Sequence, residues 1–255
     1  MDPILTLAGL GVGVVVGLTG MGGGALMTPL LVLAFGIHPT TAVGTDLLYA
    51  ASTKTVGTAV HGWKRTVQWG IVARLAAGSV PASAITLWFL SREPGGASTN
   101  AFVTIALGWA LIVTSAAVLF RNAIVRFLSK RAGELSPGRT TLFTILLGAA
   151  LGVLVSLTSV GAGALGMTVL LVLYPKRDIA QLVGSDVAHA VPLTLLAGIG
   201  HWMMGTVNWA VLGSLLVGSF PGIVVGSLLA ARAPDRVLRA ILAVVLVLVG
   251  WKLLS

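Results

Sequence analysis

Two glycine clusters have the composition and spacing of an anion-binding site. The first is Gly20-Met21-Gly22-Gly23-Gly24, and the second, about 140 residues later, is Ser159-Val160-Gly161-Ala162-Gly163. Glycine permits positive φ and leaves backbone N–H groups uncovered. A helix expected to begin near each cluster directs its partly positive N-terminal end at the cluster, and such ends bind phosphate- and sulfate-like groups. The clusters therefore predict a substrate site containing Gly22, Gly23, Gly24, Gly161 and Gly163.

Glycine also allows helices to pack closely, as in small-xxx-small motifs. This interpretation is preferred for Gly9, Gly13, Gly17, Gly148 and Gly152, whereas the three consecutive glycines at 22–24 favour the anion site. A P-loop or dinucleotide site is excluded, because no strand precedes the glycines, no Lys-Ser/Thr follows them, and apolar runs flank them.

Three charged residues lie inside apolar runs, namely Asp46, Lys54 and Asp186. A charge at the centre of a membrane helix costs about 2.5–3.5 kcal/mol on insertion scales, so such residues face a cavity or a partner. Asp46 and Lys54 are about 12 Å apart along one helix, too far to pair, and we hypothesise a Lys54–Asp186 pair instead. Either aspartate is a candidate proton carrier, with Lys54 attracting the anion. The alternative, that these residues are polar anchors between helices, remains open.

Hydroxyl and imidazole groups accompany these charges. Thr45 and Ser185 precede the two aspartates and either donate to an oxyanion, which we favour, or bond to the helix carbonyl one turn earlier. His189, one turn after Asp186, is a candidate proton relay, although a hydrogen-bonded structural histidine is the plainer interpretation. His61 and His201 occupy equivalent helix ends near tryptophans, and interfacial capping is expected for both.

The composition is that of a polytopic helical membrane protein. Of the 255 residues, 56% are hydrophobic and 9% are charged, whereas soluble domains carry about a quarter charged residues. Apolar runs long enough to cross about 30 Å of hydrocarbon recur throughout. Cysteine is absent, which excludes disulfides and thiolate metal sites. The net charge of +9 comes from basic residues between the spans, so it indicates orientation in the membrane and not nucleic-acid binding.

The chain is an internal duplication. Adding 140 to the numbers of Gly44, Asp46, His61, Thr66, Trp69 and Pro81 gives the same residue types at 184, 186, 201, 206, 209 and 221. We therefore expect one all-α membrane domain made of repeat 1 (1–121), a basic cytoplasmic linker (122–139) and repeat 2 (140–255). Each repeat contains a broken, glycine-tipped segment, 4–35 or 140–173, and three membrane-spanning helices. Duplication is a common plan for secondary transporters.

The distribution of basic residues favours a hairpin at each broken segment. If each segment enters and returns, only Arg92 and Lys252 lie on one face, and the other twelve basic residues outside or at the ends of the spans lie together. These are Lys64, Arg65, Arg121, Arg126, Lys130, Arg131, Arg139, Lys176, Arg177, Arg232, Arg236 and Arg239. Because positive loops stay cytoplasmic, both termini are expected outside. The repeats are then inverted, and the two clusters are expected to meet near the midplane.

Several of these residues carry a family likeness. The Gly-Met-Gly-Gly-Gly cluster, Pro29-Leu30, and Ala42-Val43-Gly44-Thr45-Asp46 with its second copy resemble the TauE/SafE sulfite-exporter family, from about Gly9 to Trp251. The resemblance implies a transporter of sulfite, thiosulfate or small sulfonates, commonly an exporter in bacteria. The chain departs from the family pattern at Asp46, where members typically have serine, and at Ala162, which replaces the middle glycine of the second cluster.

The expected function is a proton-coupled exporter of a small sulfur-containing oxyanion across the inner membrane. A channel for a small anion or neutral solute is the alternative. Neither a nucleophile motif nor a zinc-binding His-Glu-x-x-His is present, so an enzyme is not expected. No metal and no cofactor are expected. The expected partners are the anion, protons and the lipid bilayer, and a homodimer is left open.

Overall fold

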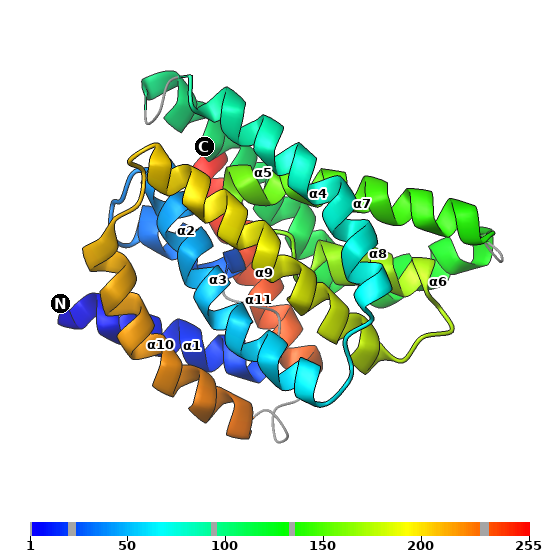
Figure 1. Cartoon of the computed structure of the whole chain (residues 1–255). Helices are drawn as coiled ribbons and strands as arrows, with labels where there is room; N and C mark the ends of the chain where they lie inside the picture. The colour runs from blue at the N-terminus through cyan, green and yellow to red at the C-terminus, as the bar shows by residue number, and fades with distance from the viewer. Residues whose placement is uncertain (1, 20–23, 93–95, 133–135, 230–234) are drawn as a thin grey trace.

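The computed structural model describes residues 2–19, 24–92, 96–132, 136–229 and 235–255, and within these ranges the chain forms eleven α-helices (Figure 1). They are α1 (Pro3–Thr19), α2 (Gly24–Leu33), α3 (Pro39–Trp63), α4 (Trp69–Leu90), α5 (Ala97–Leu119), α6 (Arg121–Ala132), α7 (Pro137–Thr158), α8 (Leu165–Leu173), α9 (Ile179–Met203), α10 (Trp209–Leu229) and α11 (Asp235–Leu254).

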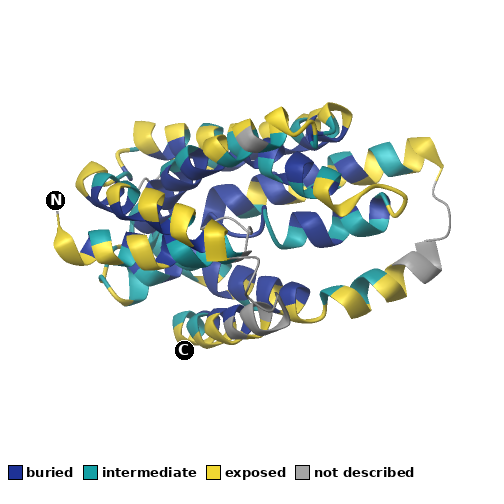
Figure 2. Cartoon of the chain, turned by 90° about the horizontal axis from the view of Figure 1, so that it is seen from below, coloured by how far each residue is buried: buried dark blue, intermediate teal, exposed yellow. Residues whose placement is uncertain are grey.

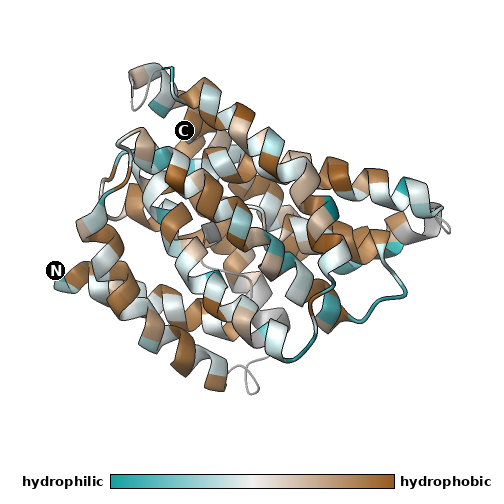
Figure 3. Ribbon diagram, viewed as in Figure 1, coloured by the Kyte–Doolittle hydropathy of each residue, from teal (hydrophilic) through white to brown (hydrophobic). Residues whose placement is uncertain are grey.

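The described helices are those of a multi-pass membrane protein, as predicted. Five of them, α4, α5, α7, α9 and α10, are long and apolar enough to cross a membrane. Most of their outward surface is hydrophobic, and hydrophilic residues gather in the connections (Figure 3). Figure 2 shows buried residues on the helix faces turned inward and exposed residues on the outer faces. A soluble protein rarely exposes apolar patches of this extent.

The helix boundaries follow the repeat. α3 and α9 both contain 25 residues and occupy equivalent positions, and α4 and α10 both begin at equivalent tryptophans, Trp69 and Trp209. The first broken segment contains α1 and α2, and the second contains α7 and α8, which end and begin on either side of the second glycine cluster. The predicted linker, 122–139, contains all of the amphipathic helix α6 except its first residue, Arg121.

Glycines allow the first helix of each repeat to lie against the fourth helix of the other repeat. A Cβ added to Gly13 of α1 would meet the Ser219 carbonyl oxygen of α10 at 2.6 Å, and one added to Gly152 of α7 would meet the Ser79 carbonyl oxygen of α4 at 2.5 Å. Gly9, Gly17 and Gly148 approach their neighbours as closely. The packing role predicted for these glycines is confirmed.

These contacts also set the depth of the second glycine cluster. α1 runs parallel to α10 and passes its middle at Gly13, while α7 runs parallel to α4 and passes its middle at Gly152. The second cluster begins about seven residues after Gly152, or about 10 Å further along α7 at 1.5 Å per residue. The second cluster therefore lies about 10 Å beyond the middle of α4. Residues 20–23 of the first cluster lie outside the described residues.

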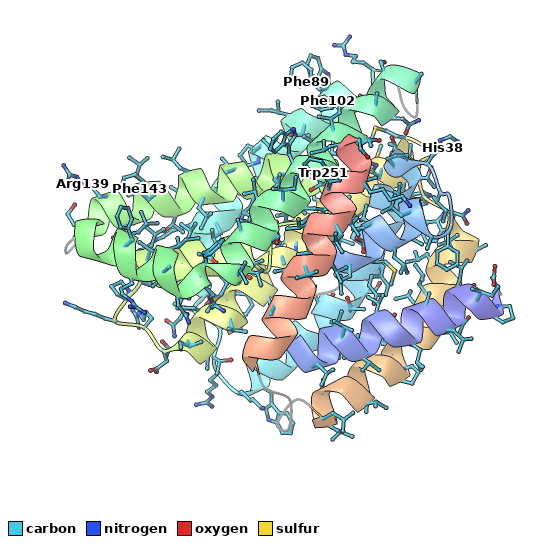
Figure 4. All side chains as sticks on the ribbon, turned by 180° about the vertical axis from the view of Figure 1, so that it is seen from behind. His38, Phe89, Phe102, Arg139, Phe143 and Trp251 are labelled. Carbon is cyan, nitrogen blue, oxygen red and sulfur yellow. The ribbon has the colours of Figure 1, made fainter. Side chains whose placement is uncertain are left out.

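Equivalent helices from the two repeats pack antiparallel at the centre of the molecule. Gly44, near the start of α3, faces His201 at the end of α9, and Gly184 of α9 faces Thr66 just after α3. Likewise, the Ser115 hydroxyl of α5 donates to the Ala243 carbonyl of α11 at 2.8 Å. Figure 4 shows Trp251 of α11 at the same end of the molecule as Phe89 and Phe102. The pairs α1–α10 and α4–α7 lie on opposite sides of this centre (Figure 1).

Candidate functional site

A cavity of about 750 Å³ opens between the two repeats. Its walls are mainly apolar side chains of α1, α3, α9 and α10, including Val16, Val56, Val183, Val187, Phe220 and Ile223. The polar and glycine positions that line it are Gly17, Thr53, Lys54, Gly57, His61, Arg121, Gly163, Asp186 and Ser227. The cavity thus combines a few charged groups with an apolar wall, which is the usual composition of a small-molecule site.

Lys54 and Asp186 face this cavity from α3 and α9. Both are almost completely buried, with exposed fractions of 9% and 4%. Lys54 lies within electrostatic reach of Asp186 and of Asp46, and Arg121, at the start of α6, lies within reach of Asp186. No ion pair within 4.0 Å joins Lys54 to Asp186 in the described part of the chain. Lys54 and Asp186 are therefore near each other without a direct ion pair. Among the described residues, the charged side chains that line the cavity are Lys54, Arg121 and Asp186.

The Asp186 carboxyl has an oxygen available for a further partner. Its Oδ1 is buried and has no hydrogen-bond partner among the described residues. α8 leaves room for it only because residue 166 is glycine, since a Cβ there would lie 2.5 Å from Oδ1. A buried polar atom without a partner is costly, so a proton, a water molecule or a ligand is expected to satisfy it.

The second glycine cluster reaches the same cavity. Its backbone reverses direction through two residues with positive φ, Ser159 at 60° and Gly161 at 111°. Gly163 and Ala164 line the cavity directly before α8. Within the described residues, no hydrogen bond is made by the N–H groups of these two residues. The N-terminal end of α8 is directed at the cavity that Lys54 and Asp186 line, whereas Gly161 itself does not line it.

Asp46, the equivalent of Asp186, lies elsewhere. It is fully buried and does not line the cavity. The Thr28 hydroxyl of α2 donates to its Oδ2 at 2.5 Å, and its Oδ1 has no partner among the described residues. The Ser159 side chain lies next to this carboxyl. Asp46 therefore bonds to α2 of its own repeat and lies beside the glycine cluster of the other repeat.

Thr45 and Ser185 join the two repeats. Thr45 Oγ1 accepts the N–H of Asn208, just before α10, at 3.0 Å, and Ser185 Oγ accepts the N–H of Gln68, just before α4, at 2.9 Å. Ser185 also donates to the Gln181 carbonyl one turn earlier, which is the alternative that the sequence left open. Each hydroxyl satisfies an orphan N–H at the start of a helix in the opposite repeat, and neither residue lines the cavity.

His189 is fully buried and bonds to Ser79 of α4 through Nε2 at 2.8 Å, while its Nδ1 has no partner among the described residues. The equivalent position is Tyr49, whose hydroxyl donates to Ser219 of α10 at 2.8 Å. These paired contacts favour the structural interpretation of His189.

Sequence reasoning did not single out Tyr49, Thr28 or a cavity role for Arg121, because no local pattern links residues so distant along the chain.

The structure thus brings together Lys54, Gly163 and Asp186, and places Thr45, Asp46, Ser185 and His189 around them in other packing contacts. Gly22 and Gly23 lie outside the described residues, and Gly24 is the first residue of α2. No group of three or more histidine or carboxylate side chains able to hold a metal ion occurs among the residues that the structure describes.

Comparison with known proteins agrees with this architecture. The family model described as "Sulfite exporter TauE/SafE" matches residues 5–253. The chain is 37% identical over 218 residues to the probable membrane transporter protein YjnA of Bacillus subtilis, covering 85% of both chains. It is 28% identical over 213 residues to the probable membrane transporter protein YdhB of the same organism, covering 80% of both. No solved structure matches the chain significantly.

Proposed function

Because the chain belongs to the sulfite exporter TauE/SafE family, we propose that this membrane transporter is a secondary exporter of a small sulfur-containing oxyanion such as sulfite, thiosulfate or a sulfonate. The observation that carries the proposal is the position of the buried Lys54 ammonium in one cavity with Gly163 and Ala164. A cation and free helix N-terminal amides in a low-dielectric cavity attract an oxyanion.

Two observations support an inverted-repeat arrangement in the inner membrane. Equivalent helices run antiparallel, α3 against α9 and α5 against α11, as expected for repeats of opposite orientation. The loops that follow α3 and α8 carry Lys64, Arg65, Lys176 and Arg177. We place these loops in the cytoplasm and both termini outside, so the cavity opens toward the cytoplasm.

Asp186 is the residue that we assign to proton coupling. When it is ionised, its charge offsets the attraction of Lys54 for an anion. When it is protonated, this offset is lost, and the positive charge of Lys54 attracts an anion more strongly. Anion binding is therefore strongest when Asp186 holds a proton, and the proton and the anion travel together. Asp46, which lies beside the second glycine cluster, is a second carrier in this proposal.

Flux assays in proteoliposomes test the function. Purified protein is reconstituted, and uptake and counter-flow of radiolabelled sulfite and thiosulfate are measured with and without an imposed pH gradient. Saturable flux with counter-flow is expected, accelerated when the anion and the proton gradient point the same way. Flux without counter-flow would indicate a channel. No flux of either anion would overturn the assignment of the substrate.

A further inference from the structure

His61 and His201 have the same local geometry in the two repeats. In each case Nδ1 lies 2.9 Å from the hydroxyl of a threonine five residues later, Thr66 or Thr206. The same threonine hydroxyl lies within hydrogen-bond distance of the histidine carbonyl, at 3.1 and 2.9 Å. Both imidazole rings are therefore held in one orientation at the end of a central helix, with Nε2 directed away from the threonine.

The surroundings of Nε2 differ. His201 is fully buried, and its Nε2 lies 3.0 Å from the Ser156 carbonyl oxygen of α7. Because a carbonyl oxygen only accepts, Nε2 of His201 carries a hydrogen and donates it to Ser156. His61 is half-exposed and lines the cavity. Its Nε2 bonds to no residue that the structure describes.

The missing acceptor of His61 is identified by the repeat. Leu157-Thr158 is equivalent to Leu18-Thr19, so the equivalent of Ser156 is Gly17. Packing supports this match, because Ser156 contacts Ser83 of α4 and Gly17 contacts Ile223, the residue of α10 equivalent to Ser83. Gly17 lines the same cavity as His61. Donor and acceptor therefore face one cavity, whereas their equivalents are already in contact.

The residues around His61 are also more exposed than the equivalent residues around His201. Val183 and Val187 line the cavity and are partly exposed, but their equivalents Val43 and Leu47 are fully buried. α7 packs against α9, whereas the cavity lies between α1 and α3, the equivalent helices. One side of the molecule is closed and the other is open.

We propose that His61 and His201 are the two gate residues of transport. In the conformation described here, His201 holds α7 against α9. In the opposite conformation His61 donates to the Gly17 carbonyl, α1 closes on α3, and the His201–Ser156 bond breaks. The inference rests on the proposed transport function, which requires access from each side in turn. It assigns to the two histidines a role that interfacial capping does not include.

Cysteine labelling tests the gates without any substrate, since the natural chain contains no cysteine. Val187→Cys reports the cavity that is open here, and Leu47→Cys reports its closed equivalent. Each reporter is combined with His61→Ala or His201→Ala, and the initial rate of maleimide labelling is measured. His201→Ala is expected to raise labelling at 47 and lower it at 187, and His61→Ala to do the reverse. A change of about fivefold is expected, which corresponds to one net hydrogen bond.

Two further variants serve as the rescue and the negative control of this labelling experiment. His201→Gln retains an N–H donor near the position of Nε2 and is expected to restore the parental labelling at both reporters. His38→Ala, in the exposed loop before α3, is expected to change neither rate. Labelling changes of the same sign at both reporters would overturn the gate proposal, because they indicate general loosening. Opposite changes without flux of sulfite or thiosulfate would retain the gates and overturn only the proposed substrate.

Discussion

The two repeats share one set of helices but not one set of charges. Asp186 faces a cavity with Lys54 and the second glycine cluster, while its equivalent, Asp46, is fully buried against Thr28. Lys54 itself has no charged counterpart, because Thr194 occupies the equivalent position and bonds to the Ala190 carbonyl. Duplication therefore supplied the framework, and divergence between the copies placed the charged site on one side of it.

The largest effects are expected where the repeats are alike. A Cβ at either Gly78 or Gly218 would overlap the backbone of the neighbouring α7 or α1. We expect Gly78→Leu and Gly218→Leu to destabilise the protein by similar amounts, at least the 1–3 kcal/mol typical of overpacking. Thermal unfolding in detergent measures this. Gly213→Leu, at a position where a Cβ meets nothing within 4 Å, is the control, and equal loss in the control would contradict the argument.

The next largest effect is expected to differ between equivalent positions of the two repeats. Lys54→Met removes the buried cation and is expected to lower anion flux about 100-fold, since losing one partner of a buried charged contact costs about 2–5 kcal/mol. Thr194→Val, at the equivalent position, is expected to lower flux less than threefold. Uptake in proteoliposomes gives both values. Comparable losses in the two variants would show that the site does not depend on this asymmetry.

A smaller loss is expected from crowding Asp186. Gly166→Ala places a methyl group 2.5 Å from Oδ1, so the carboxyl must move away from its position in the cavity. We expect about a tenfold lower flux, a weaker response to a pH gradient, and a protein that remains folded. Gly213→Ala serves as the matched control in the same assay. If the response of Gly166→Ala to a pH gradient is unchanged, Asp186 does not take part in proton coupling.

The smallest effects concern the hydroxyls that join the repeats. Thr45→Val and Ser185→Ala each remove an acceptor for a helix-start N–H, and each should destabilise the fold by about 1 kcal/mol. The apparent KM for the anion is expected to stay within twofold of the parent. A tenfold rise in KM would instead support the ligand role that the sequence favoured for these residues.

Local patterns in the sequence predicted much of the fold. Apolar runs predicted the membrane helices, and the second glycine cluster predicted the break between α7 and α8 at 158–165. The site was predicted less completely. Lys54, Gly163 and Asp186 do share a cavity, but Arg121 at the start of α6 carries no local signal of its proximity to Asp186, since contacts of that range depend on helix packing.

The sequence by itself determined the class, the duplication and the types of residue available for anion binding, because hydropathy and repetition are properties of the linear chain. Only the tertiary structure decided which of two equivalent sets is open. His61 and His201 are each followed by Thr-Val five residues later, yet one lines a cavity and the other is buried against Ser156. The physical reason is that packing of α7 against α9, and the space between α1 and α3, are relations between distant segments.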